Sequence, residues 1–125
     1  MPFTPVIGHF MMLHERLREI RSHGIGFFVS HHSKLAEYFR KGLKDLPLSF
    51  LSNIPSNALT AISCPKDIDA FDLVTRLAED FNCFVAPNGG DLKYRVFRVS
   101  HLGEQNETDI DFLINALEDT LNNFQ

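Results

Sequence analysis

The stretch that decides the fold is YRVFRVSHLGEQNETDIDFLINALEDTL, residues 94–121. Its first seven residues alternate aromatic and β-branched side chains with two arginines, which is typical of a half-buried strand. The pattern breaks at His101-Leu102-Gly103, where the glycine can adopt backbone angles that other residues avoid. Asn106 then precedes Asp109 by three residues, which predicts a capping box at the start of a helix. The apolar stripe expected on that helix consists of Ile110, Leu113, Ile114, Leu117 and Leu121.

Arg98 is expected to point away from the core of the fold. Side chains on a strand alternate between its two faces, so Phe97 and Val99 share one face while Val96 and Arg98 share the other. If Phe97 and Val99 pack on helices, the strand holds the guanidinium group of Arg98 rigidly at the surface. A fixed guanidinium can bind a carboxylate through two parallel hydrogen bonds, so Arg98 is a candidate for binding an acid.

The composition is that of one globular domain. The chain has 125 residues, 44% of them hydrophobic and 22% charged, and a formal net charge of −4. This mildly acidic balance argues against a nucleic acid or a membrane as partner, and no apolar run is long enough to span a bilayer. Cys64 and Cys83 lack the spacing of metal ligands, which favours two reduced thiols and a cytoplasmic location.

Residues 1–45 are expected to form a leading pair of helices. Thr4-Pro5 is a typical helix start, and Gly24 is a typical residue just after a helix end. The apolar stripe of the first helix consists of Phe10, Leu13, His14, Leu17 and Ile20. A second helix is predicted from Gly26 to Leu43, and its stripe consists of Phe28, His32, Leu35, Phe39 and Leu43.

The remainder of the chain predicts a small sheet with two more helices. The expected strands are residues 48–51, 58–64, 83–86 and 94–100. Asp67 or Asp69 caps a third helix, and Pro87-Asn88-Gly89-Gly90 is a strong turn signal. The inward side chains of that helix are Leu73, Leu77 and Phe81. The order α-α-β-β-α-β-β-α predicts an α+β fold with a small, mostly antiparallel sheet and helices packed on one face.

The sequence resembles the C-terminal small domain of the class V, fold-type I aminotransferases, which use pyridoxal phosphate (PLP). FRVSHLG, residues 97–103, is similar to the family signature F-R-I-G-x-x-G, with Ser100 at the first glycine and Gly103 at the second. Thr4-Pro5 before the helical pair and the segment 56–60 also match the family, although the latter lacks the family's arginine. The resemblance covers residues 4–121, and the most similar members are the alanine–glyoxylate, serine–pyruvate and 2-aminoethylphosphonate transaminases.

The resemblance implies roles for particular residues of this chain. Arg98 would bind the carboxylate of the substrate, and Thr4 would contact the PLP phosphate of the neighbouring subunit in a homodimer. Gly89-Gly90 would belong to a loop near the substrate entrance. The plainer alternatives are a surface or interdomain ion pair of Arg98, for example with Glu104 or Asp91, and an ordinary β-turn at the two glycines.

The resemblance also implies that the chemistry belongs to a large domain absent from this chain. PLP needs a lysine for its Schiff base and an acidic partner for its ring nitrogen, and the family has both in the large domain. The lysines here lie on predicted solvated faces or turns: Lys34, Lys41, Lys44, Lys66 and Lys93. The intact enzyme would move an amino group between an amino acid and a 2-keto acid, whereas this segment alone is expected to bind no PLP and to be inactive. No metal is expected, because the adjacent pair His31-His32 lacks a third ligand and the spacing of a metal site.

A second hypothesis is a free-standing, non-catalytic α+β module that binds or regulates another chain. A domain without its large partner should leave Val6, Ile7, Phe10 and Met11 uncovered and should self-associate through them. A natural module should instead cover or replace these apolar residues.

Overall fold

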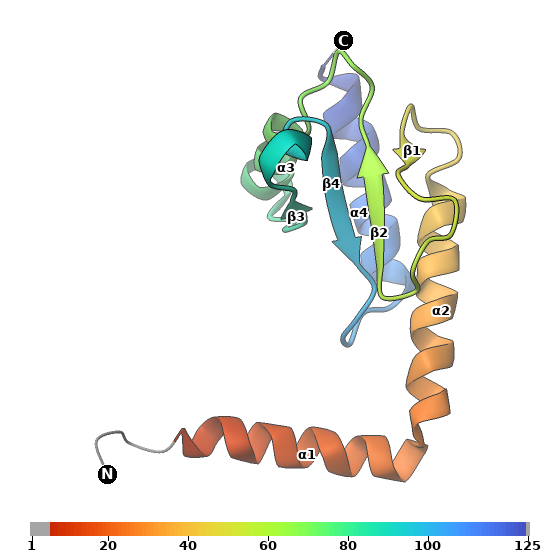
Figure 1. The fold of residues 1–125 in the computed structure, drawn as a ribbon, viewed down its shortest axis with the longest axis vertical. Helices are drawn as coiled ribbons and strands as arrows, with labels where there is room; N and C mark the ends of the chain where they lie inside the picture. The colour runs from red at the N-terminus through yellow and green to blue at the C-terminus, as the bar shows by residue number, and fades with distance from the viewer. Residues whose placement is uncertain (1–5, 125) are drawn as a thin grey trace. The chain divides into compact units, whose positions relative to one another are not determined.

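The computed structural model describes residues 6–124 and has the element order that the sequence predicts (Figure 1). The elements are α1 (Ile7–His23), α2 (Ile25–Gly42), β1 (Ser49–Phe50), β2 (Leu59–Ser63), α3 (Ala70–Phe81), β3 (Ala86–Pro87), the 3-10 helix η1 (Gly90–Leu92), β4 (Val96–Ser100) and α4 (Glu107–Asn122). The predicted α+β fold is therefore confirmed. The residues form two compact units, the first ending at His31 and the second beginning at His32.

The second unit contains a four-stranded antiparallel sheet with the strand order β1-β2-β4-β3. In the register of the two central strands, Phe97 is opposite Ile62 and Val99 is opposite Thr60, and all four side chains are buried. In Figure 1, α4 lies behind β2 and β4 and covers this face. The helices thus pack on one face of the sheet, as predicted.

The core of the second unit is made by the apolar stripes that the sequence indicates. Its helical members come from α2, α3 and α4: Leu35, Phe39, Leu43, Leu73, Leu77, Ile110, Leu113, Leu117 and Leu121. Removing such side chains from water is the main favourable contribution to folding, about 1.5–3 kcal/mol for each one. The helical spacing of these residues therefore accounts for three helices condensing on a single sheet face.

Side-chain caps fix where α3 and α4 begin. Of the two predicted candidates for α3, Asp69 is the cap, because its Oδ1 accepts hydrogen bonds from the backbone N–H groups of Phe71 (2.8 Å) and Asp72 (3.2 Å). The capping box predicted for α4 is also present. Asn106 Oδ1 accepts from the N–H of Asp109 at 3.2 Å, and Asp109 Oδ2 accepts from the N–H of Asn106 at 2.9 Å.

Several boundaries differ from the prediction. The strand predicted at residues 94–100 begins at Val96, and the first two strands are each shorter at both ends. α1 begins at Ile7 with Val6 as its N-cap, later than Thr4-Pro5 indicates, and Thr4 lies outside the described residues. The third strand is residues 86–87 rather than 83–86. After α3 the chain reverses at Asn82, which has a left-handed backbone, and it meets β4 only where Ala86 is opposite Arg98. Pro87 is compatible with this position because β3 is an edge strand, where a missing N–H breaks no ladder hydrogen bond.

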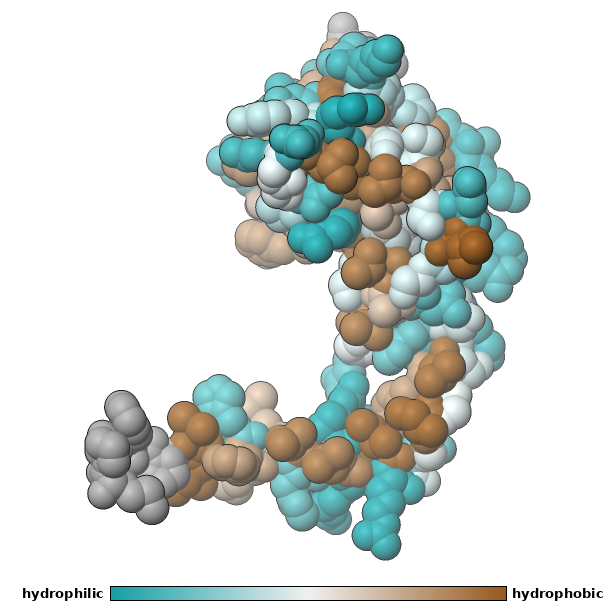
Figure 2. Space-filling view, viewed as in Figure 1, coloured by the Kyte–Doolittle hydropathy of each residue, from teal (hydrophilic) through white to brown (hydrophobic). Residues whose placement is uncertain are grey.

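The first unit exposes its apolar side chains. None of the residues of α1 is buried, and Val6, Ile7, Phe10 and Met11 are each 57–65% exposed. Figure 2 shows apolar side chains spread along this unit. The stripe that the sequence indicates on α1 therefore has no cover within the described chain. No helix among residues 6–124 has the length and apolar character needed to cross a membrane.

Candidate functional site

Arg98 lies in the middle of β4 with its side chain exposed, between the buried residues Phe97 and Val99. The alternation of the strand therefore places the guanidinium on the sheet face opposite the core, as the sequence predicts. Its Nη2 donates a hydrogen bond to the carbonyl oxygen of Pro87 on the edge strand at 3.1 Å. This bond uses one N–H of a group that carries five, so donors remain for an anion.

The neighbours of Arg98 on this open face are small. Ala61 of β2 and Ala86 of β3 are directly opposite Arg98 on its two sides, so the three residues form one row across the sheet. Within residues 6–124, Arg98 forms no ion pair, and the alternative of a surface salt bridge is therefore not what the structure contains. An exposed guanidinium held by a rigid strand, with methyl groups on both sides, leaves space for a carboxylate above the sheet.

The turn predicted at residues 87–90 lies next to Arg98. The hydrogen bond from Arg98 to Pro87 joins the arginine to the start of this segment. Gly89 is extended, and Gly90 has a φ of +57°, a left-handed conformation that favours glycine, where η1 begins. The structure thus brings together Arg98 and the segment that contains Gly89 and Gly90, whereas Thr4 lies outside the described residues.

A buried histidine at the end of β4 is a feature that sequence reasoning missed. The His101 side chain is 0% exposed, its Nε2 is 2.7 Å from Thr60 Oγ1, and its ring centroid is 5.4 Å from that of Phe39. Burial is the main cause that lowers the pKa of His101 to about 4, and the positive charge of Arg40 contributes to the same shift. The alternation of Phe97 and Val99 continues to residue 101, so the strand pattern contains the signal that would have placed this ring in the core.

Arg40 of α2 fixes the loop between β1 and β2. Its guanidinium donates to the carbonyl oxygen of Ser56 at 3.3 Å, to Asn57 Oδ1 at 3.3 Å and to Thr60 Oγ1 at 3.4 Å. Asn57 Nδ2 in turn donates to Ser33 Oγ at 3.2 Å. Each bond is long, but together they anchor the loop to a helix of the core.

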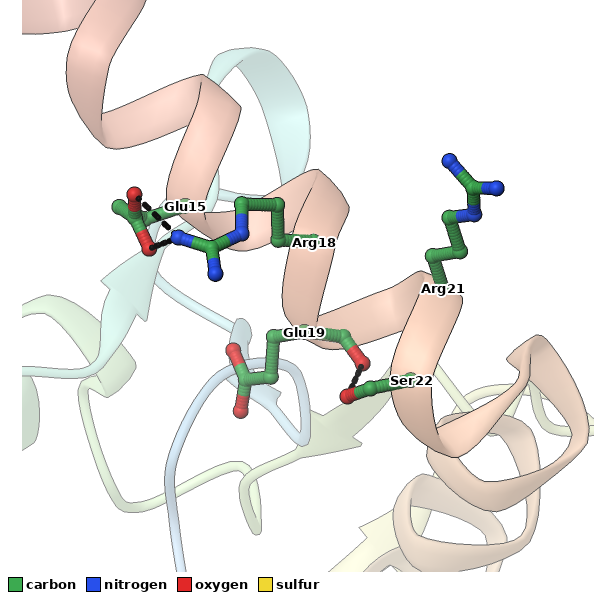
Figure 3. Close-up of a pocket in the computed structure, with 5 residues that line it drawn as sticks. All are labelled: Glu15, Arg18, Glu19, Arg21 and Ser22. Atoms are coloured by element: carbon green, nitrogen blue, oxygen red, sulfur yellow. Dashed lines mark hydrogen bonds and ion pairs between the residues drawn. The ribbon is translucent and has the colours of Figure 1, made fainter.

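A surface hollow on α1 has no features of a ligand site (Figure 3). It is lined by Glu15, Arg18, Glu19, Arg21 and Ser22. Arg18 Nη1 pairs with both carboxylate oxygens of Glu15 at 3.2 Å, and Ser22 Oγ donates to the carbonyl oxygen of Glu19 at 2.9 Å. Exposed pairs within one helix contribute little to stability, so this region is a solvated helix face.

The described residues do not fit a complete PLP site. Among the lysines, Lys41 pairs with Glu37, and Lys93 lies over the rings of Phe71 and Tyr94. Lys34, Lys44 and Lys66 are exposed. None of these environments is the enclosed one in which a lysine carries a coenzyme.

The two thiols within residues 6–124 lie in environments that disfavour the thiolate. Both cysteines are free, and burial raises the pKa of Cys64 to about 11 and that of Cys83 above its usual value. Neither is therefore a ready nucleophile. No group of three or more His, Cys, Asp or Glu side chains in this part of the chain could hold a metal ion.

Known proteins include relatives whose sequences are similar to this chain over most of its length. No protein-family model matches it. The small subunit of a soluble hydrogenase from Synechococcus sp. (strain PCC 6716) is 30% identical over 122 residues, which are 96% of this chain and 32% of the relative. Serine–glyoxylate aminotransferase of Arabidopsis thaliana is 27% identical over 112 residues, which are 87% of this chain and 28% of the relative.

Solved structures show the same correspondence. Alanine–glyoxylate aminotransferase from Nostoc sp. matches with a TM-score of 0.88 and 30% identity, over 95% of this chain and 32% of that one. Pyridoxamine–pyruvate aminotransferase from Mesorhizobium loti shares the fold, with a TM-score of 0.87 over 99% of this chain and 33% of that one, at 22% identity. The chain spans about a third of the length of these relatives. It is homologous to the class V aminotransferases, and its extent is that expected for the C-terminal domain of such a protein.

Proposed function

We propose that residues 1–125 are the small C-terminal domain of a PLP-dependent aminotransferase, and that Arg98 binds the carboxylate of its amino-acid or 2-keto-acid substrate. The observation that carries the proposal is the placement of Arg98. Its guanidinium is exposed on a strand whose other face is locked into the core, it has no ion-pair partner in the described chain, and only alanines are opposite it. The homology to aminotransferases supplies the class of reaction.

The contribution of Arg98 to the reaction would be positional and electrostatic. A guanidinium fixed on a strand binds a carboxylate in one orientation, so the reacting carbon of the substrate is held in one place. PLP, when bound in the intact enzyme, supplies the electron sink for the chemistry. Since the described residues do not fit the coenzyme, the proposal includes that this segment alone neither binds PLP nor transaminates.

The exposed apolar residues of the first unit support a missing large domain. A free-standing module should cover or replace Val6, Ile7, Phe10 and Met11, yet all four are exposed. We therefore favour the aminotransferase domain over the binding or regulatory module. The same proposal includes a homodimer in the cytoplasm, contact of Thr4 with the PLP phosphate of the neighbouring subunit, and Gly89-Gly90 at the substrate entrance.

The length of the endogenous protein and the presence of covalently linked PLP test the proposal first. Mass spectrometry of the protein carrying this segment should find a product much longer than 125 residues, with PLP linked to a lysine outside the segment. A native product of this length that binds no PLP would discard the aminotransferase and leave the binding module.

Substitution of Arg98 tests the role of the residue. In the intact enzyme, Arg98→Leu should raise the Michaelis constant of the amino acid roughly 10- to 100-fold, because a charge-assisted hydrogen-bonded pair contributes about 1.5–3 kcal/mol. Arg95→Leu is the matched control, since Arg95 is also exposed and lies just before the same strand. Steady-state kinetics with equal Michaelis constants for both variants would contradict the role of Arg98.

A further inference from the structure

The carbonyl oxygen of Pro87 that binds Arg98 lies on the outer edge of the sheet. His101, just after β4, donates its N–H to the carbonyl oxygen of Ala58, just before β2, at 2.9 Å. Because the backbone groups of successive residues point to alternate sides of an antiparallel strand, Arg98 bonds toward β3, where Ala86 is opposite it. Pro87 follows Ala86 and therefore directs its carbonyl oxygen away from β4.

The side chain of Arg98 consequently extends over β3 toward this outer edge. Arg98 and Ala86 are opposite each other and lie on the same, open face of the sheet. From that face, the Nη2 atom of Arg98 reaches the carbonyl oxygen of Pro87 at 3.1 Å. The guanidinium group is therefore at the rim of the sheet, on the side of β4 away from β2. An anion that binds it is expected at this rim, next to the segment that follows Pro87.

Asn88 directly follows Pro87 and is close to the guanidinium. A planar trans peptide places the Cα atom of Asn88 on the same side as the carbonyl oxygen of Pro87, so this Cα atom and Arg98 Nη2 are at most roughly 6 Å apart. Asn88 is half-buried, and its side chain makes no hydrogen bond with residues 6–124. The two N–H donors of its side-chain amide are thus available to a ligand at this rim.

The connection from β3 to β4 holds Asn88 in place. Before it, Ala86 pairs with Arg98, and after it the chain forms η1, where the N–H of Lys93 donates to the carbonyl oxygen of Gly90 at 3.1 Å. A connection fixed at both ends loses little conformational freedom when a ligand binds. A carboxylate has about four acceptor positions, and a guanidinium that binds it through two parallel hydrogen bonds fills two of them. An amide donor beside the guanidinium would fill another.

We propose that Asn88 is a second substrate-binding residue, which donates a hydrogen bond from its side-chain amide to the carboxylate that Arg98 binds. The inference rests on the proposed function, because it takes the anion at Arg98 to be the carboxylate of the substrate. The plainer role of Asn88 is that of a turn residue, since asparagine favours turns through hydrogen bonds to its own backbone. The experiment therefore has to separate the amide donor from the turn.

Steady-state kinetics of the intact enzyme with substitutions of Asn88 test the inference. Asn88→Ala should raise the Michaelis constant of the amino acid roughly tenfold, because it removes a hydrogen bond to a charged group. Asn88→Asp keeps the shape and the turn preference of asparagine but repels a carboxylate, so it should raise the Michaelis constant at least as much. Asn53→Ala, the same change at an exposed position in the loop between β1 and β2, should leave the Michaelis constant unchanged. Melting temperatures near that of the parent protein confirm that the variants fold.

A double variant shows whether Asn88 and Arg98 bind the same group of the substrate. In Arg98→Leu the carboxylate is no longer fixed, so adding Asn88→Ala should raise the Michaelis constant by less than about twofold. A full tenfold increase in that background would mean that the two residues act independently, and it would overturn the inference.

The possible failures have different meanings. A Michaelis constant equal to that of the parent in Asn88→Ala or Asn88→Asp, together with a raised one in Arg98→Leu, would overturn the inference and leave the proposed function intact. A Michaelis constant that is unchanged in Arg98→Leu would overturn both.

Discussion

At the scale of single residues, β4 and the residue that follows it place two ionisable side chains on opposite faces of the sheet. Arg98 lies on the open face, where water solvates its charge. His101 lies on the core face, where Nδ1 has no hydrogen-bond partner among the described residues and Nε2 meets Thr60. Burial disfavours the charged imidazolium, and Arg40 and His32 add positive charge nearby. His101 is therefore neutral in the folded chain at neutral pH.

The neutral state of His101 makes stability dependent on pH. Its folded-state pKa of about 4 lies below the unfolded value of 6.5, so the unfolded chain takes up a proton first as the pH falls. The contribution of His101 to stability is complete above pH 6.5 and is lost as the pH falls toward 4. Urea unfolding at a series of pH values should show a loss of about 1–3 kcal/mol from this residue.

A variant that cannot titrate isolates the contribution of His101. His101→Gln keeps a polar group near Thr60 and should lower the dependence of the unfolding free energy on pH between 6.5 and 4. His9→Gln, at an exposed position of α1, should leave that dependence as it is. Identical pH profiles for the parent and His101→Gln would show that the imidazole is not held neutral by burial.

At the scale of elements, α4 is the helix whose start is most firmly encoded. The capping box satisfies backbone N–H groups that have no partner within the helix, and it places the apolar stripe in register with the sheet. The second cap, Asp69 on α3, acts in the same way. α1 begins at Ile7, its N-cap Val6 provides no side-chain hydrogen bond, and none of its residues is buried. The helices α3 and α4 therefore have both a side-chain cap and a buried apolar face, whereas α1 has neither.

Removing the cap of α4 should destabilise the second unit. In Asn106→Ala the N–H groups of Thr108 and Asp109 lose their acceptor at 2.8 and 3.2 Å, and about 1 kcal/mol of unfolding free energy should be lost. Asn122→Ala, the same change in the exposed last turn, should alter the unfolding free energy by no more than a few tenths of a kcal/mol. Urea denaturation measures both values. Equal effects of the two substitutions would mean that the cap is not what stabilises the start of α4.

At the scale of the whole molecule, the two units differ in how they are stabilised. The second unit has a continuous core across α2, α3, α4 and the sheet. The first has no buried residue in its helix α1 and exposes most of its large apolar side chains. A surface of this kind is typical of an interface with another domain or chain. The cooperative stability of the isolated chain should therefore come from the second unit.

Deletion of α1 tests this division. A variant that lacks residues 1–23 should keep the unfolding free energy of the full chain within about 0.5 kcal/mol, because α1 buries nothing. Phe39→Ala, at a fully buried position of α2, should cost about 3–5 kcal/mol. Denaturation followed by circular dichroism measures both. A large loss of stability on deletion would show that α1 contributes to the core after all.

The sequence by itself determined the fold class, the element order, the cap of α4 and the apolar stripes that form the core. These follow from interactions between residues close in the chain: the spacing of Asn106 and Asp109, the helical period of the apolar residues, and the alternation that turns Arg98 away from Phe97 and Val99. Their physical causes act within one turn of helix or one strand, so a local pattern is enough to predict them.

Only the tertiary structure decided which residues meet across the sheet. The register that places Ala61 and Ala86 on either side of Arg98, the contact of Arg98 with Pro87, and the pairing of His101 with Thr60 all join segments that are 11 to 41 residues apart. The shortened strand β3 has the same origin, since its length depends on where the chain leaving α3 meets β4. Such contacts depend on how strands pair and helices pack in three dimensions. The alternation along one strand fixes which face a side chain takes, but it does not say which residue of another strand lies beside it.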